Sequence, residues 1–210
     1  MNITITRALT RIKSIDKLLE KELSANQTPF VVAVKKDSKI AGFENKESYM
    51  TAVKARLQSI NALINEKTKL KNAILKSNSV TKVIIAGKEY TVSDAIAMKE
   101  IIEKKNLLLG KLNGDYAQAS FTMDKENERA KVSAENYIIN IFGSDKTSNK
   151  NLADEIENAT KAYMDRNSYS LCDPISIKNK INELEKEIIE FRGEVDLVLS
   201  ESNAKTSIEV

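Results

Sequence analysis

The chain has 210 residues, of which 41% are apolar and 30% are charged, a balance typical of a folded protein rather than a disordered one. Its 33 basic and 30 acidic residues give a formal charge of +3, too small a bias for a dedicated nucleic-acid-binding protein. Two prolines and six glycines are few for this length. This composition therefore predicts long helices in a single domain spanning residues 1–210.

The absence of histidine limits the chemistry that the sequence supports. Without histidine there is no Ser-His or Cys-His pair, and the commonest metal ligand is missing. The single cysteine, Cys172, excludes an internal disulfide, and its acidic neighbour Asp173 disfavours a reactive thiolate. We therefore expect no catalytic residue, no metal site and no cofactor. The sequence also has no apolar window of membrane-spanning length and no signal-peptide core, which predicts a cytoplasmic protein.

The first predicted helix begins near Thr4 or Thr6 and ends before Pro29, since proline cannot continue a helix. The β-branched run from 30 to 34 and the segment 40–43 follow, separated by the turn Lys36-Asp37-Ser38. This pattern predicts a small β-hairpin near 30–43. A helix about 50 Å long is then expected from Asn45 to Asn78, where no glycine or proline interrupts the sequence.

The stretch V-I-I-A-G-K-E-Y-T-V, residues 83–92, resembles a phosphate-binding loop because a glycine-lysine pair follows an apolar run. A phosphate loop of this type requires glycine five residues before the pair and Ser or Thr after it. The sequence has Lys82 and Glu89 at those positions, so both requirements fail. Alternation on either side of Gly87 instead predicts a β-hairpin over 81–92.

A third helix is expected to begin at Ser93, and Gly110 and Gly114 predict a kink in it, or a break before a further helix over 116–141. The polar segment 143–151 predicts a flexible loop. Its alternating oxygen side chains from Asp145 resemble a calcium loop, but the glycine and glutamate that an EF-hand requires are absent. A shorter helix over 152–165 follows.

The last helix is predicted over 174–199, with Asp173 as its cap and Pro174 at its first position. Its apolar residues recur at spacings of four and three, which predicts a coiled-coil-like packing seam with a partner helix in the same chain or in another. The heptad seam consists of Ile177, Ile181, Leu184, Ile188, Phe191, Val195 and Val198. The tail after it either adds an edge strand or frays.

Basic residues gather at the two predicted hairpins, and their default role is to keep exposed turns solvated. If the hairpins lie together, the lysines would form a site for an anionic small molecule, with an aromatic ring for stacking. The residues of this candidate ligand site are Lys36, Lys39, Lys82, Lys88 and Tyr90.

Two blocks, S-V-T-K-V-I-I-A-G-K-E-Y-T-V-S-D-A-I-A-M-K and E-V-D-L-V-L-S-E-S-N-A-K-T-S-I-E-V, resemble segments of coil-containing bacteriophage proteins. The layout of a hairpin leading into a long helix is also similar to that of the septicolysin-like helical family. The resemblance carries no catalytic residues. It implies a phage-encoded, oligomeric helical protein, in the host cytoplasm or in the virion.

The sequence thus predicts a mainly α protein: an elongated antiparallel helical bundle or coiled coil with one or two small β-hairpins. The expected function is that of a non-catalytic, self-associating binding protein that engages or sequesters a phage or host partner. One alternative is a structural or assembly role in a virion. Another is an anti-defence role as a sponge for a nucleotide-derived signal of host immunity. Binding to nucleic acid or to a membrane is not expected.

Overall fold

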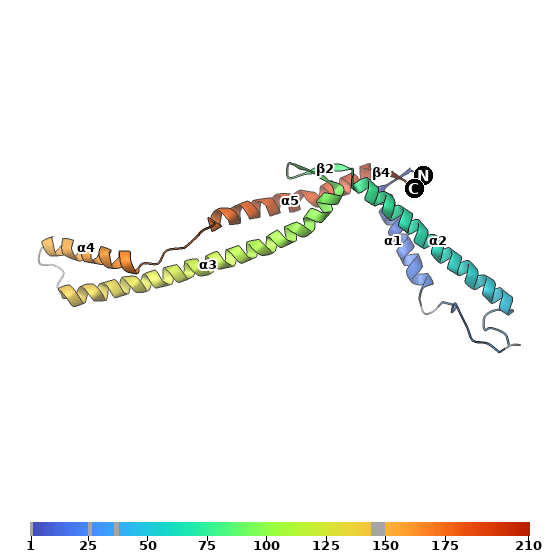
Figure 1. Ribbon diagram of the computed structural model, residues 1–210, viewed down its shortest axis with the longest axis horizontal. Coiled ribbons are helices and arrows are strands. Elements are labelled where there is room, and N and C mark those ends of the chain that lie inside the picture. Colours follow the sequence, from blue (N-terminus) through green and yellow to red (C-terminus); the bar gives the residue numbers. More distant parts are fainter. Residues whose placement is uncertain (1, 25–26, 36–37, 144–149) are drawn as a thin grey trace. The chain divides into compact units, whose positions relative to one another are not determined.

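The computed structural model describes residues 2–24, 27–35, 38–143 and 150–210, and among them it is mainly helical (Figure 1). The mainly α prediction with small two-stranded sheets is therefore confirmed. The described elements, in chain order, are β1 (Asn2–Thr4), α1 (Ile5–Glu22), α2 (Lys46–Asn78), β2 (Lys82–Ile85), β3 (Lys88–Thr91), α3 (Val92–Phe142), α4 (Lys150–Asn167), α5 (Ile177–Lys205) and β4 (Ser207–Glu209).

The chain divides into two compact units, where the sequence analysis predicted a single domain. Unit 1 comprises residues 1–100 and 190–210, and unit 2 comprises residues 101–189. Two helices, α3 and α5, each contribute residues to both units. Unit 2 is therefore inserted, in sequence, between the two segments that build unit 1.

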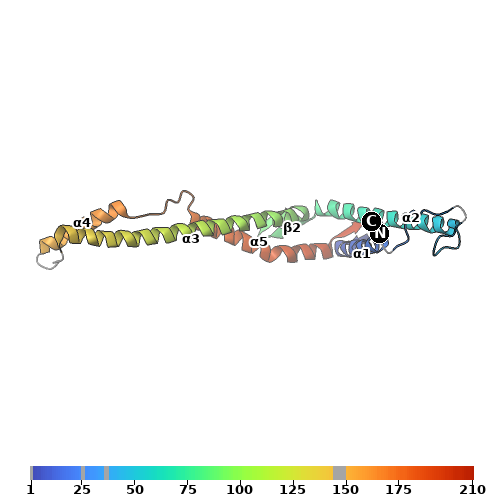
Figure 2. The ribbon, with the colours of Figure 1, turned by 90° about the horizontal axis from the view of Figure 1, so that it is seen from below.

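In unit 1, α1 and α2 form an antiparallel pair that lies side by side in both views (Figures 1 and 2). The Thr4 side chain accepts a hydrogen bond from the Arg7 N–H and caps α1, while Asn45 and Ser48 form a reciprocal capping box at the start of α2. Arg11 pairs with Glu66 at 2.6 Å, and Glu22 pairs with Arg56 at 3.1 Å. From the first pair to the second, the residue on α1 advances from 11 to 22 while its partner on α2 goes back from 66 to 56, so the two helices run in opposite directions.

The tail forms a strand and completes the core of unit 1. Strand β4 pairs antiparallel with β1, and Ile208 lies opposite Ile3. The Ile5 N–H donates to the Thr206 carbonyl at 3.0 Å, which joins the start of α1 to the same sheet. The buried residues of this core are Ile5, Ala8, Ile12, Ile15, Leu70, Ile74 and Ile208.

The hairpin predicted over 81–92 is present as β2 and β3, with Val83 opposite Tyr90. Ala86 and Gly87 both have positive φ angles, 50° and 72°, as a two-residue turn of type I′ requires. The side chains of Val83 and Ile85 are buried, and those of Lys82 and Ile84 are exposed. The alternation that predicted the hairpin therefore also sets its buried face.

The hairpin predicted near 30–43 needs correction, because the described residues of this segment, 30–35 and 38–43, contain no strand. A two-stranded hairpin is stable only when one face packs on something else. Here the apolar residues make side-chain contacts with α2 instead of pairing. Phe30 lies under the Arg56 guanidinium at 4.5 Å, and Phe43 packs edge-on against Tyr49 at 5.3 Å.

The break predicted at Gly110 and Gly114 also needs correction, because α3 is continuous for 51 residues. Leu109 and Lys111, which flank Gly110, are strong helix formers, and a run of buried or half-buried residues continues past Gly110 at alternating spacings of three and four. That run is Ala95, Met98, Ile102, Lys105, Leu109, Leu112 and Tyr116. Packing along this face outweighs the weak helix propensity of glycine.

The C-terminal helix begins at Ile177 rather than at Pro174. Ser176 has a positive φ of 53°, which excludes a helical start at residue 174. The Asp173 carboxylate caps the helix from further back, since both its oxygens accept the Ile177 N–H, at 3.0 and 2.9 Å. The helix ends at Lys205, beyond the predicted residue 199. In unit 2, Lys105 pairs with Glu187 at 2.6 Å and the Lys178 ammonium lies 5.1 Å from the Tyr116 ring centre, so α3 and α5 run antiparallel there.

Candidate functional site

The hairpin residues of the predicted ligand site are engaged in contacts within unit 1. Lys82 forms an ion pair with Glu89 across the hairpin at 2.8 Å, and this hydrogen bond raises the pKa of Lys82. Tyr90 is half-buried and packs edge-on against Phe191 of α5, with 6.1 Å between ring centres. Lys88 is exposed on β3. Tyr90 therefore anchors the hairpin to α5 rather than offering a free stacking surface.

The turn of the hairpin is occupied by a carboxylate. The Ala86 N–H, which a phosphate-binding loop would direct at phosphate, donates to Glu194 Oε2 of α5 at 2.7 Å. A carboxylate at this position repels a phosphate group, because both carry negative charge. This contact agrees with the interpretation of the glycine-lysine pair as a plain turn.

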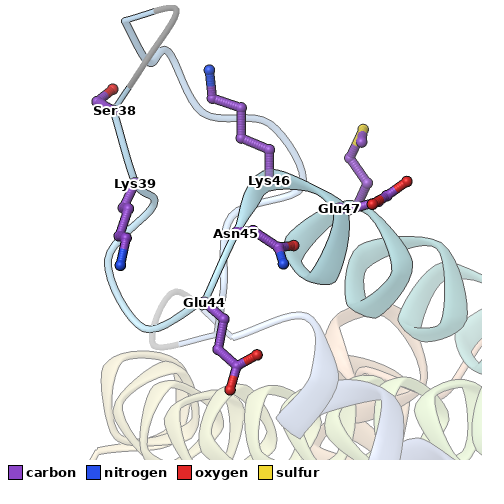
Figure 3. Close-up of a pocket in the computed structure, with 7 residues that line it drawn as sticks. Ser38, Lys39, Glu44, Asn45, Lys46 and Glu47 are labelled. Carbon is purple, nitrogen blue, oxygen red and sulfur yellow. The ribbon is translucent and has the colours of Figure 1, made fainter.

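Lys39, another residue of the predicted ligand site, lies at the opposite end of α2. Lys39 lines an open hollow of about 560 Å³ with Ser38, Glu44 and the first residues of α2 (Figure 3). Its ammonium points away from that of Lys46, which donates to the Lys35 carbonyl at 3.0 Å (Figure 3). Lys36 lies outside the described residues. The 33 residues of α2 separate its start, beside Lys39, from the hairpin by about 50 Å, so the structure does not bring Lys39 together with Lys82, Lys88 and Tyr90.

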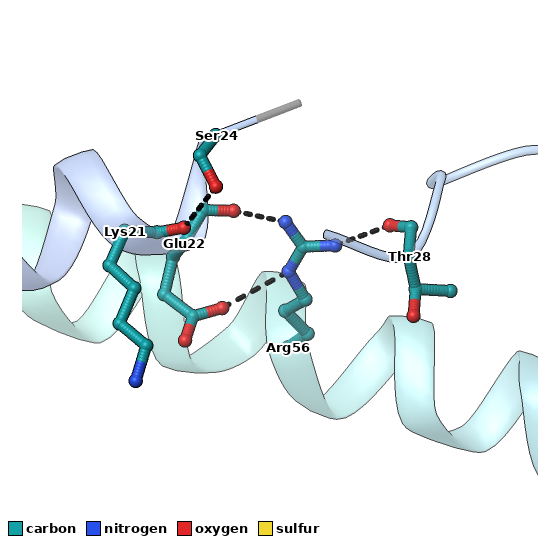
Figure 4. Close-up of polar contacts among 5 residues, drawn as sticks. All are labelled: Lys21, Glu22, Ser24, Thr28 and Arg56. Carbon is teal, nitrogen blue, oxygen red and sulfur yellow. Dashed lines mark hydrogen bonds and ion pairs between the residues drawn. The ribbon is translucent and has the colours of Figure 1, made fainter. Parts of the chain in front are cut away.

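Arg56 is the centre of a polar network that the sequence analysis did not predict (Figure 4). Its guanidinium pairs with the Glu22 carboxylate at 3.1 Å and donates to the backbone carbonyls of Glu22 and Thr28. These bonds fix the chain after α1 onto α2. The sequence contains a signal for this network, because Arg56 occupies a position where the α2 pattern expects an apolar residue, three residues after Val53 and four before Ile60. An arginine at such a position is expected to find several partners.

Unit 2 contains two adjoining hollows where the segment before α5 meets α3. Their volumes are about 350 Å³, at the lower end of the range for small-molecule sites, and 210 Å³, below that range. Tyr116, Leu171 and Asp173 line both hollows, and Cys172 and Lys178 each line one. These residues were predicted only as helix, cap or incidental positions.

The polar residues that line these hollows are Tyr116, Lys178, Asp115, Asp173, Ser176 and Asn179. A hydrogen bond with Lys178 lowers the pKa of Tyr116, and the same interaction raises the pKa of Lys178. Asp173 is engaged in capping α5, with both oxygens accepting backbone N–H groups. A second carboxylate in the lining, that of Asp115, pairs with Lys111 at 2.5 Å. The exposed Cys172 thiol has no histidine to activate it, since the chain contains none.

The predicted heptad seam is occupied within the chain. Ile181, Leu184 and Ile188 are buried in unit 2, and Phe191 and Val195 are buried in unit 1. Ile177 and Val198, at the two ends of the seam, are half-buried. Because these side chains already pack within one chain, a partner would have to bind elsewhere.

The calcium-like positions in the predicted flexible loop 143–151 fall largely on residues 144–149, which lie outside the described residues. In the part of the chain that the structure describes, no group of three or more Cys, Asp or Glu side chains is placed to hold a metal ion. None of the described helices is long and apolar enough to cross a lipid bilayer.

Comparison with known proteins adds no relative. No protein-family model, curated protein or solved structure matches the chain.

Proposed function

We propose that this chain is a non-catalytic, self-associating helical protein that acts by binding a macromolecular partner. The observation that carries the proposal is the exposure of large apolar side chains along two helices, beside the buried side of α2 and opposite the buried side of α3. Examples are Met50, Leu57 and Ile64 on α2 and Leu107, Phe121 and Val132 on α3.

These side chains follow helical periodicity rather than lying at random. Met50, Leu57 and Ile64 are spaced by seven residues, so they form one row on α2. Ile64 lies four residues after Ile60, so this row borders the buried side to which Tyr49, Ile60 and Leu70 belong. Single exposed apolar residues are normal on protein surfaces, but a row along a helix is typical of an interaction surface. Burying one fully exposed side chain of this kind contributes about 1.5–3 kcal/mol, which has to offset the entropy lost on association, so a specific complex requires a row of them rather than one or two.

A stripe along a helix suits another helix better than it suits a small molecule, since a small ligand requires a concave site. The proposal therefore favours a protein partner, and a further copy of the chain is the simplest one. The phage origin implied by the sequence resemblance fits a protein of this kind. The virion-assembly and nucleotide-sponge alternatives stay predictions, and the separation of Lys39 from the hairpin lysines weakens the motivation for the second.

Light scattering coupled to size-exclusion chromatography tests the proposal over a concentration series. We expect a mass that rises above the monomer value of 23.5 kDa as concentration increases. A strict monomer at millimolar concentration would contradict self-association. Co-purification of the protein with phage particles would support the virion alternative over a free binding protein.

A further inference from the structure

The charges of the chain are unevenly distributed, although they nearly cancel over its whole length. Residues 1–78 contain 15 Lys and Arg against 7 Asp and Glu, whereas residues 79–210 contain 18 against 23. Most of this excess lies on α2, which carries seven basic and two acidic residues, while α3 carries seven and eight and α5 five and seven. Exposed helices usually carry both signs, so the composition of α2 favours a partner of opposite charge.

The side of α2 that faces away from α1 bears an uninterrupted polar row. We call it the α2 outer row, and its members are Thr51, Lys54, Gln58, Asn61, Asn65, Lys69, Asn72 and Lys76. Their spacings of three and four residues place them along one side of the helix, over a length of about 38 Å. All eight are exposed, and none of them is acidic, apolar or aromatic.

The α2 outer row lies opposite the contacts between α2 and α1. Lys54 is separated by about 160° around the helix axis from Arg56, whose guanidinium pairs with Glu22 of α1. Asn72 and Lys76 are each separated by about 160° from Ile74, which is buried in the core that the two helices share. The packing of α1 on α2 therefore leaves the row exposed.

The lysines of the α2 outer row are not neutralised by neighbouring carboxylates. None of the three forms an ion pair within the described part of the chain, whereas lysines on α3 and α5 pair with acidic residues three or four positions away. The only acidic residue between positions 48 and 88 is Glu66, which Arg11 of α1 engages at 2.6 Å. These ammonium groups are thus available to an external anion.

We propose that the α2 outer row binds duplex DNA, with α2 lying in the major groove. Within the row three amides, Gln58, Asn61 and Asn65, lie between Lys54 and Lys69. The major groove of B-DNA admits an α-helix, so the lysines reach phosphates at the edges of the groove while the amides pair with base edges inside it. This binding does not require the proposed self-association, whose apolar side chains lie beside the row rather than in it.

The composition of the row distinguishes duplex DNA from other anionic partners. A membrane surface requires large apolar side chains on the same face as the lysines, and a single strand requires aromatic rings for stacking. The major groove of an RNA helix is too deep and narrow to be read by side chains. An acidic protein offers acceptors only, whereas amides also accept, and base edges supply both donors and acceptors. The whole-chain charge of +3, from which nucleic-acid binding was not expected, conceals the basic α2.

Fluorescence anisotropy of the full chain with a labelled duplex of mixed sequence, about three helical turns long, tests the proposal. Each lysine that contacts a phosphate contributes about 0.9 to the slope of log affinity against log salt, so three contribute about 2.7. We therefore expect the affinity to fall at least about 40-fold between about 50 and 200 mM salt. Absence of binding at the lower salt, or an affinity independent of salt, would overturn the proposal.

Replacing the lysines of the row tests whether they make these contacts. The triple variant Lys54→Gln, Lys69→Gln, Lys76→Gln keeps the helix, because glutamine has nearly the helix propensity of lysine. We expect its affinity at the lower salt to fall at least about tenfold and its slope to flatten by about 2.7. Circular dichroism and an unchanged thermal midpoint confirm that the variant is folded.

The matched control removes the same charge from exposed lysines of α1 in the same unit: Lys13→Gln, Lys17→Gln and Lys21→Gln. We expect its slope to change by less than about one, since these side chains lie outside the row. Equal losses in the two triple variants would show that only overall charge matters and would overturn the placement of DNA on α2.

The amides in the middle of the row are tested by a substitution of equal size. Asn61→Asp with Asn65→Asp places two carboxylates where DNA approaches, at almost unchanged helix propensity. We expect the affinity to fall at least about tenfold, because these carboxylates repel the phosphates. Thr10→Asp with Ser14→Asp, which adds the same charge to exposed positions of α1, is the control. An equal effect of the two double variants would contradict the proposed groove contact.

Competition identifies the class of anion. Unlabelled duplex DNA should displace the probe at a lower concentration than single-stranded DNA, duplex RNA, polyglutamate or vesicles containing phosphatidylserine. Displacement by any of these as effectively as by duplex DNA would overturn the assignment. Light scattering separates this result from the proposed function, because a strict monomer that binds duplex DNA would remove self-association and leave the DNA-binding row standing.

Discussion

Arg56 joins three segments of unit 1 through one side chain: the end of α1, the chain that follows it, and α2. Only 14% of its side chain is exposed, although the Arg11–Glu66 pair on the same two helices is largely solvated. Solvation decides how much such contacts contribute to stability. An exposed ion pair exchanges one well-hydrated state for another, while a shielded arginine satisfies carbonyl groups that water reaches poorly.

We therefore predict that Arg56→Met lowers the free energy of unfolding by roughly 2 kcal/mol, because it leaves the Glu22 carboxylate and two carbonyls without their donor. Urea denaturation followed by circular dichroism measures the change. Arg11→Met is the matched control, and we expect a much smaller effect from it. Equal shifts for the two variants would show that Arg56 is no more than a surface charge.

At the scale of elements, the sequence pattern correctly predicted the helices and strands that depend on neighbouring residues alone. Asn45 and the uninterrupted sequence after it were enough to place α2, and alternation around Gly87 placed the hairpin of β2 and β3. The segment 30–43 has the same composition signals, but it found side-chain contacts on α2 rather than a strand partner. Gly110 and Gly114 predicted a break because propensity is a local property, while the continuous packing face of α3 depends on α5, which lies far along the chain.

The candidate site also depends partly on local pattern and partly on how distant segments are arranged. The prediction that the lysines form one site required two hairpins to lie together, and no local pattern can specify that; Lys82 and Lys88 lie on the strands β2 and β3 rather than in their turn. The α2 helix holds the two regions apart. Arg56, by contrast, broke the apolar pattern of its own helix, so a sequence reader could have found it by asking which polar residue occupies a core position.

The turn between β2 and β3 gives a prediction at the element scale. Gly87 has a φ of 72° and a Cβ there would meet nothing within 4 Å, so Gly87→Ala would suffer from backbone strain alone, about 1 kcal/mol. Ala86→Asn should instead raise the stability of the turn, since asparagine tolerates positive φ better than alanine. The thermal unfolding midpoints of the two variants measure these changes: we expect that of Gly87→Ala to fall and that of Ala86→Asn to rise. Shifts of the same sign would contradict the type I′ assignment of the turn.

At the scale of the whole molecule, the main feature is that unit 1 is built from two segments separated in sequence by unit 2. Strands β1 and β4 join these segments, and Ile208 on β4 is only 4% exposed. The sequence left the tail as either an edge strand or a frayed end. Pairing between residues some 200 positions apart leaves no local signal, which is why the choice stayed open.

We predict that Ile208→Ala destabilises unit 1 by about 2–4 kcal/mol, the usual cost of truncating a buried isoleucine. Hydrogen exchange should accelerate in α1 and in the C-terminal part of α2, while exchange in α4, which belongs to unit 2, stays unchanged. Ser207→Ala, on the exposed side of the same strand, is the control. Faster exchange throughout both units would show that they unfold together rather than separately.

The pairing of β1 with β4 also has a consequence in time. During synthesis α1 and α2 emerge from the ribosome early, but the Ile208 side chain that completes their core is made about 130 residues after the end of α2. At typical elongation rates of about 5–20 residues per second, α1 and α2 wait on the order of ten seconds for it. Through that interval their apolar faces are incompletely covered on every nascent chain, and neighbouring chains on one messenger RNA carry the same faces. The self-association proposed above would therefore have exposed apolar faces of α1 and α2 available to it before Ile208 is synthesised.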